Sequence, residues 1–285
     1  MLGRCLKSLE AGSWPDIAWS FSGLNTDGCP IECGFSTHEE TFRISLEVAG
    51  PDYPEHARLD AALTLLSALG LPRPEPGLVE LWRGLQAGAH LKWGCWLGLR
   101  GSATGMRGKL YLELPGRAPV CLSDSRLHMT GFDPGQGWEE AYCILRSPTE
   151  ARLRHILRDS PAAGREAVLD AIGQLTGMPL RLALTWTEIG ASIARSGNDA
   201  PRAAIFFRAR ALPGGAAALR PHFMHRANYR ALLGDCPVAA LPDHGVVSLI
   251  PHETGAELRV GISAIALGRF WSGYAGRCDE QPAAA

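Results

Sequence analysis

Polar and apolar side chains alternate through residues 107–116, Arg-Gly-Lys-Leu-Tyr-Leu-Glu-Leu-Pro-Gly. Because successive side chains of a strand point to opposite faces, this spacing predicts a β-strand. Its apolar face, with Leu110, Leu112 and Leu114, can pack against other apolar groups. Its opposite face holds two cations, a phenol and a carboxylate, from Arg107, Lys109, Tyr111 and Glu113. Such a face belongs either on the solvent side of a sheet or in a polar interior that binds an anion.

The same strand pattern recurs in five pairs of segments, each pair joined by a turn rich in Gly, Pro or polar residues, as hairpins require. The predicted strands are 30–36 with 41–48, 91–100 with 107–114, 126–132 with 138–145, 180–189 with 202–212, and 245–250 with 256–267. Ten antiparallel strands can close into a barrel, which removes the exposed strand edges. A ten-stranded barrel is wider than the eight-stranded kind that side chains fill, so it can hold ligands.

Helical periodicity separates several of these hairpins. Residues 56–69 repeat apolar groups on one helical face, at Leu59, Ala62, Leu63 and Leu66. Residues 78–87 and 216–233 are also predicted to be helical. The pattern therefore indicates an α+β fold, a ten-stranded antiparallel β-barrel with helices on the outside.

Two further signals mark helix ends. Ser-Pro-Thr-Glu at 147–150 predicts a capping box, in which Ser147 caps the helix and Glu150 reaches back. Gly177 before Pro179 predicts a helix end, because glycine accepts the left-handed cap conformation and proline stops continuation. No low-complexity linker divides the chain, so we expect one domain over 1–285, with a short lead-in over about 1–15 and a frayed tail over about 276–285.

Composition excludes several classes. A hydrophobic content of 46% indicates a globular protein, and a net charge of −1 argues against general nucleic-acid binding. No segment approaches the ~18 apolar residues of a membrane span, and the first residues lack the apolar stretch of a secretory signal. We therefore expect a cytoplasmic protein that binds neither nucleic acid nor membrane. The sequence also lacks the G-x-S-x-G and Walker motifs of hydrolases and P-loop enzymes.

No resident metal site is predicted. Cys29 and Cys33 form a C-x3-C pair without the second pair that zinc needs. The eight cysteines are scattered, and in a reducing compartment we expect them to be mostly reduced and buried. His222 and His225 are spaced i, i+3 but lack a nearby third ligand, so an ordinary helix surface is expected there.

The second strand of each hairpin carries a polar face, and four of these five faces hold a cation. The face residues are Arg43, Ser45 and Glu47; Arg107, Lys109 and Tyr111; Trp138, Glu140 and Tyr142; Arg202, Phe206 and Arg208; and Glu257, Arg259, Gly261 and Ser263. Surface strands also carry Lys and Arg. The coincidence across strands favours a shared polar interior.

This arrangement resembles the aromatic prenyltransferases of the ABBA, or PT-barrel, type, which are built from helix-flanked hairpins. Residues 25–36, Asn-Thr-Asp-Gly-Cys-Pro-Ile-Glu-Cys-Gly-Phe-Ser, are similar to the D-G-x-P-x-E-F-S stretch of the indole prenyltransferases, and an Arg-bearing strand follows, as it does there. Lys-Leu-Tyr at 109–111 matches their K-x-Y strand. The likeness spans about residues 25–267.

The resemblance implies transfer of an allylic isoprenoid from its diphosphate, such as dimethylallyl or geranyl diphosphate, to an aromatic acceptor. The acceptor would be an indole, either free or as a Trp side chain in a peptide. By this likeness the diphosphate-binding residues would be Arg43, Lys109 and Tyr111, with Arg202, Arg208 and Arg259 as further candidates. Glu32 would accept a hydrogen bond from the acceptor. The residues that shield the allylic cation or line the acceptor pocket would be Tyr142, Phe206, Trp96 and Trp186.

The chain also departs from the family pattern. Glu139 and Glu140 stand on the third hairpin where the family usually has cations. Either the cation set is incomplete, or the donor is bound through Mg²⁺ held by carboxylates; no tightly bound cofactor is otherwise implied. The chain is short beside the fungal indole enzymes and closer in size to cyanobactin-type peptide prenyltransferases, which implies a more open barrel mouth that suits a large or peptide acceptor.

Other interpretations stay open at this point. Glu32 could be a surface residue or a structural partner of Arg43. The strand tryptophans, including Trp93 and Trp138, could belong to the core. The whole protein could be a non-catalytic barrel that binds a small molecule or peptide, or an enzyme that acts on phosphate esters with the same cationic lining.

Overall fold

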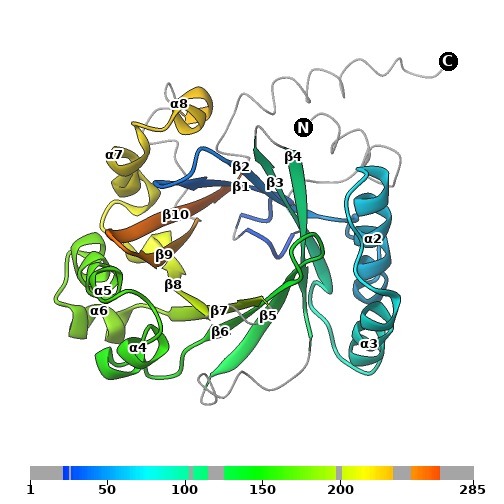
Figure 1. The fold of residues 1–285 in the computed structure, drawn as a ribbon, viewed down its shortest axis with the longest axis horizontal. Helices are drawn as coiled ribbons and strands as arrows, with labels where there is room; N and C mark the ends of the chain where they lie inside the picture. Colours follow the sequence, from blue (N-terminus) through cyan, green and yellow to red (C-terminus); the bar gives the residue numbers. More distant parts are fainter. Residues whose placement is uncertain are drawn as a thin grey trace.

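The chain forms a closed antiparallel barrel of ten strands with helices around it (Figure 1). A computed structural model describes residues 22–25, 27–102, 105–114, 125–196, 201–233 and 245–263. Neighbours in sequence are neighbours in the sheet, and β10 closes it by pairing with β1. The predicted ten-stranded barrel is therefore confirmed. The expected lead-in and tail lie outside the described residues, and the single-domain extent stays a prediction.

The strands are short and lie close to their predicted positions, with one exception. They are β1 (Ile31–Ser36), β2 (Phe42–Glu47), β3 (Cys95–Ser102), β4 (Gly105–Leu112), β5 (Arg126–Asp133), β6 (Trp138–Ile144), β7 (Ile189–Ser196), β8 (Arg202–Arg208), β9 (Val246–His252) and β10 (Gly255–Ser263). The exception is 180–189, which we predicted as a strand. Its first seven residues form helix α6 (Leu180–Trp186), and β7 begins only at Ile189.

The remaining helices flank the barrel. They are α2 (Arg58–Ala68), α3 (Pro76–Ala87), α4 (Glu150–Ile156), α5 (Ala162–Thr176), α7 (Arg220–Phe223) and α8 (Ala227–Leu233), with the 3₁₀ turns η1 (Glu55–Ala57), η3 (Ala209–Ala211) and η4 (Gly215–Leu219). In Figure 1, α2 and α3 lie along one side of the barrel, α4, α5 and α6 along another, and α7 and α8 beside β1 and β10. No helix among these described residues is long and apolar enough to cross a membrane.

Two predicted helix features need correction and one is confirmed. The residue that caps α4 is Thr149, whose hydroxyl accepts the Arg152 N–H, whereas Ser147 lies before the helix with a φ of 45°. The single helix predicted over 216–233 is divided into η4, α7 and α8. Gly177 ends α5 with a φ of 65°, and Pro179 then precedes α6, as the sequence indicated.

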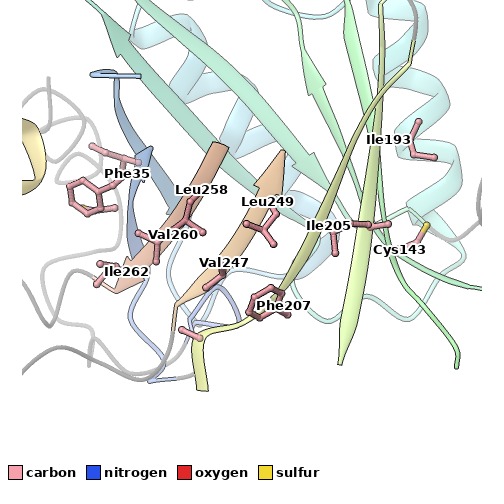
Figure 2. Packing of buried hydrophobic residues seen from close by; sticks show 14 of the residues in the cluster. Phe35, Cys143, Ile193, Ile205, Phe207, Val247, Leu249, Leu258, Val260 and Ile262 are labelled. Carbon is pink, nitrogen blue, oxygen red and sulfur yellow. The ribbon is translucent and has the colours of Figure 1, made fainter. Parts of the chain in front are cut away.

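The main hydrophobic core lies between the outer face of the barrel and the helices. Leu110 and Leu112 are fully buried there, and Leu66 of α2 packs over Gly108. Figure 2 shows the same face on β8 and β9, where Ile205 pairs with Leu249 and Phe207 pairs with Val247. Burial of this apolar face is the main source of stability for such a fold. It also fixes the strand register, because a slip of one residue would bring every leucine into the lumen.

The cysteines behave as small core residues. Cys29, Cys33, Cys95 and Cys143 are all buried and form no disulfide. The other four cysteines lie outside the described residues.

Candidate active site

Register places the polar face of β4 inside the barrel. Lys109 and Tyr111 alternate with the buried leucines and so point inward, as predicted. The Lys109 ammonium reaches over β5 to β6, where it forms an ion pair with Glu140 and donates a hydrogen bond to the Tyr142 hydroxyl at 3.0 Å. These inward side chains keep some solvent exposure, 25% for Lys109, whereas the outer leucines have none. The inner face is therefore in contact with solvent, unlike the outer face.

Glu140 is held firmly at this position. Its carboxylate accepts the Tyr142 hydroxyl at 2.6 Å as well as the Lys109 ammonium. Burial opposes its charge, yet the attraction and hydrogen bond of Lys109, with bonds from Ser192 and Tyr142, lower the pKa of Glu140 to about 2. Burial also opposes the charge of Lys109, but Glu140 raises the pKa of that ammonium. Both groups are therefore ionised at neutral pH.

Aromatic rings surround this ion pair. The Lys109 ammonium lies 5.2 Å from the centre of the Tyr111 ring and 5.3 Å from that of Tyr142. Tyr142 is also 6.0 Å from Tyr111 and 6.2 Å from Phe206, centre to centre. Tyr111, Tyr142 and Phe206 thus form a row of rings across the inner face. Aromatic faces of this kind stabilise cations.

A second charged group lies where β1, β2, β3 and β10 meet. Arg43 of β2, Arg100 of β3 and Arg259 of β10 all approach Glu39, which belongs to the turn between β1 and β2. Arg259 also pairs with Glu257, whose carboxylate is fully buried. Arg259 acts electrostatically on Lys109 and Arg43, so it connects the two charged groups. We call Arg43, Arg100, Lys109 and Arg259 the cation cluster.

Glu32 lies apart from this cluster. Within the described residues its carboxylate has no hydrogen-bond or ion-pair partner, and Arg43 pairs with Glu39, not with Glu32. Burial, partly offset by the charge of Arg208, raises the pKa of Glu32 to about 7. A carboxylate that is desolvated, unpaired and near neutral pKa is typical of functional sites.

Glycines on the inner face make room for these side chains. A Cβ atom at Gly261 would lie 2.4 Å from the carboxyl carbon of Glu32, and one at Gly131 would lie 2.4 Å from Cε of Lys109. Similar close approaches occur between Gly98 and the Tyr111 ring and between Gly190 and the Phe206 ring. These glycines lie on the inner face of their strands, which strand alternation in the sequence indicates. The side chain that each one accommodates belongs to another strand, so it is known only from the folded structure.

A stacked tryptophan pair packs beside Tyr111 of the inner face. The rings of Trp93 and Trp96 stack with centres 4.0 Å apart, and Leu24, Tyr111 and Met129 pack against them. Trp96 also donates its indole N–H to Glu47 at 2.8 Å. Both tryptophans are more than nine-tenths buried, so they belong to a small apolar cluster and expose little surface to a ligand.

Not all predicted site residues meet in the lumen. Trp186 is 77% exposed at the end of α6, so its predicted place in an acceptor pocket is wrong. Arg202 is exposed at the start of β8 and lies over the Trp138 ring at 4.7 Å. Arg208 lies at the opposite end of β8, where its charge acts on Glu32 and His128. Of the later arginines, only Arg259 joins the cation cluster.

Two members of the charged groups were not predicted from the sequence. Arg100 belongs to the first strand of its hairpin, whereas the polar faces that predicted the site are those of the second strands. Glu39 lies in a turn, where no alternation predicts the direction of a side chain. Their spatial neighbours come from three strands, so only the closed barrel brings them together.

Within the described part of the chain, no group of three or more His, Cys, Asp or Glu is placed to hold a metal ion. His222 lies in α7 and His225 just beyond it, and both are exposed. The inner face can instead bind an anion beside aromatic rings, with one unpaired carboxylate further along the lumen.

Solved structures with the same kind of barrel are known. A 6-dimethylallyltryptophan synthase from Micromonospora olivasterospora, in complex with DMASPP and Trp, aligns over 93% of this chain and 96% of its own, at a TM-score of 0.66 and 15% identity. A 5-dimethylallyltryptophan synthase from Streptomyces coelicolor aligns over 93% of this chain and 90% of its own, at a TM-score of 0.67 and 13% identity. The NotF prenyltransferase aligns over 91% of this chain and 85% of its own, at a TM-score of 0.56 and 14% identity.

Sequence comparison adds nothing to this. No protein-family model matches the chain, and no curated protein matches it. The structural likenesses show the fold alone: the chain has the ABBA-type prenyltransferase barrel over most of its length, as the two sequence motifs indicated.

Proposed function

We propose that this protein is an aromatic prenyltransferase that moves a dimethylallyl or longer allylic group from its diphosphate to an indole. The acceptor is tryptophan or a related indole, either free or within a peptide. One observation carries the proposal: the cation cluster, a row of aromatic rings and the unpaired Glu32 carboxylate all face the same lumen. Similar barrels have been solved with dimethylallyl thiolodiphosphate and L-tryptophan, which supports it.

The cation cluster is the proposed diphosphate site. Arginine and lysine bind phosphate oxygens through strong, directional hydrogen bonds. Breaking the allylic C–O bond leaves both bonding electrons on the diphosphate. Fixed positive charge beside that oxygen therefore lowers the activation free energy for departure of the diphosphate. Tyr111 and Tyr142, next to Lys109, place their rings beside the allylic carbon as it gains positive charge.

The acceptor is proposed to lie between these rings and Glu32. An indole carbon attacks the allylic carbon, a C–C bond forms, and loss of the ring proton restores aromaticity. The Glu32 carboxylate accepts the indole N–H, which orients the ring and favours the positive charge that develops on it. Gly261 leaves room for the carboxylate, because any Cβ atom there would displace it.

The reaction is proposed to occur in the cytoplasm. The four cysteines that the structure describes are buried and form no disulfide, which agrees with a reducing compartment.

Calorimetric titration with dimethylallyl diphosphate separates this function from its rivals. We expect saturable one-to-one binding. Parallel titrations, one with Mg²⁺ and one with a chelator, show whether the donor binds with or without the ion. A non-catalytic barrel specialised for a small molecule or peptide would give no heat with the donor. A phosphate-ester enzyme would bind it and release diphosphate without any acceptor.

The proposed role of Glu32 also predicts a pH dependence. Only the ionised carboxylate carries the charge that stabilises the electron-poor ring, and burial raises the pKa of Glu32 to about 7. Turnover at saturating donor and acceptor should therefore rise from about pH 6 to about pH 8. In Glu32→Gln this rise should disappear. A wild-type profile that stays flat or falls over the same range would contradict the role.

A further inference from the structure

The turn between β1 and β2 places a carboxylate in the proposed diphosphate site. Arg43 donates to Oε2 of Glu39 at 2.7 Å, Arg100 donates to the same oxygen, and an Arg259 nitrogen lies 3.8 Å from Oε1. Three arginines from three strands thus share one carboxylate. Arginine forks that converge on an oxyanion form a typical phosphate-binding geometry.

Electrostatics shows why an anion is needed there. Burial, followed by the nearby charges of Arg259 and Arg100, lowers the pKa of the Arg43 guanidinium. Burial likewise opposes the charge of Glu39, but the attraction and hydrogen bond of Arg43, with the charges of Arg100 and Arg259, lower its pKa to about 2. Glu39 is therefore ionised at any working pH, and it offsets the repulsion among the arginines.

Glu39 differs from Glu140 and Glu257, the other two carboxylates that pair with the cation cluster, in how it is held. Glu140 and Glu257 project from strands and accept further bonds from Tyr142 and from Ser36, at 2.6 Å each. Glu39 projects from a turn, its side chain is 28% exposed, and its other bond comes from its neighbour Thr41 at 3.1 Å. Its carboxylate can rotate toward solvent without moving a strand.

The rest of the turn is anchored independently of Glu39. The His38 ring stacks on His252 of β9, with centres 4.4 Å apart. Glu40 forms an ion pair with Arg226 at 3.5 Å and accepts the Ala227 N–H at the start of α8 at 3.4 Å. The backbone can therefore stay in place while the Glu39 side chain leaves the arginines.

We propose that Glu39 is an internal ligand of the diphosphate site, which the donor must displace before Arg43, Arg100 and Arg259 can bind its phosphates. The identity of that anion rests on the proposed function. Donor affinity then reflects the difference in binding free energy between two anions on the same arginines, the diphosphate and the Glu39 carboxylate. Arg100 becomes a diphosphate ligand that the sequence motifs did not indicate.

Titration of the full-length protein with inorganic pyrophosphate tests this proposal. Glu39→Gln keeps the shape of the side chain and removes its charge, so pyrophosphate should bind about tenfold more tightly than to the wild type. Glu40→Gln, on the same turn but directed at α8, is the matched control and should bind as the wild type does. The increase in melting temperature on adding pyrophosphate should also be larger for Glu39→Gln, because its arginines lack their internal anion.

The outcomes separate the proposal from the function on which it rests. Equal or weaker pyrophosphate binding by folded Glu39→Gln would show that Glu39 organises the arginines, and this would overturn the displacement proposal while the diphosphate site stands. If Glu39→Gln fails to fold, Glu39→Ala with the same two measurements replaces it. Pyrophosphate binding to none of the proteins, the wild type included, would overturn the function and the proposal together.

Discussion

Replacing Glu32 with Gln is expected to lower turnover by roughly two to three powers of ten, the usual loss when one positioned catalytic group is removed. Gln keeps the size of the side chain beside Gly261 and loses only the negative charge. The interaction with the acceptor N–H strengthens as the ring becomes positive, so the loss should appear in kcat more than in KM. Donor affinity should change little, because the cation cluster belongs to other strands. Single-turnover kinetics and donor titration measure the two effects separately.

A matched control for this variant is Glu80→Gln, which removes a carboxylate from the exposed surface of α3, outside the barrel. Its turnover should equal that of the wild type. Near-normal turnover in Glu32→Gln, or a loss confined to donor affinity, would show that Glu32 does not act on the acceptor.

Replacing Lys109 with Met is expected to damage both donor binding and stability. The ammonium is the only ion-pair partner of Glu140 among the described residues, and Met leaves that partly buried carboxylate without a cation. Breaking one side of a fully buried ion pair costs about 3–5 kcal/mol of unfolding free energy, and we expect a smaller loss here because both side chains keep some contact with solvent. Donor affinity should fall at least about tenfold, since a hydrogen bond to a charged group is worth about 1.5–3 kcal/mol. Denaturant unfolding and calorimetry measure these two losses.

The double variant Lys109→Met with Glu140→Gln distinguishes binding from folding. It removes both charges, so most of the lost stability should return, while donor affinity should stay low because the cation is still absent. Wild-type donor affinity in the stable double variant would mean that Lys109 holds Glu140 and does not bind the diphosphate.

Strand alternation predicted the barrel and its register for a physical reason. Each strand has one face against the helices and one against the lumen, so a buried leucine at 110 or 112 fixes Lys109 and Tyr111 inside. The hydrophobic pattern and the site therefore come from the same property of the chain, and predicting one predicts the other.

The pattern was ambiguous at 180–189 because a short apolar run fits both a strand and a helix. Pro179 supplies the backbone angle that precedes a helix, and the segment packs Ala183 and Leu184 inward. Trp186 then falls at the exposed helix end. Pro179 indicated a helix start, but the alternation of leucines at 180, 182 and 184 favoured a strand, and the strand was predicted.

The charge balance of the site could not be predicted, because it depends on contacts between strands far apart in sequence. The four cations of the cluster are accompanied by three carboxylates, Glu39, Glu140 and Glu257. Glu140 was visible as an acidic residue where a cation was expected, but its bond to Lys109 required the closure of β4, β5 and β6. The contacts of Glu39 with the three arginines depend on the path of the turn between β1 and β2.

The most direct test of the account is the transfer reaction itself. Purified protein, dimethylallyl diphosphate and either tryptophan or a tryptophan-containing peptide are incubated, and the mixture is followed by mass spectrometry and phosphorus NMR. The account predicts an indole product heavier than the acceptor by one C5H8 unit, one diphosphate released for each product, and almost no product with Glu32→Gln in the same time. Donor that remains intact beside folded wild-type protein, with no adduct on free or peptide indole, would contradict it.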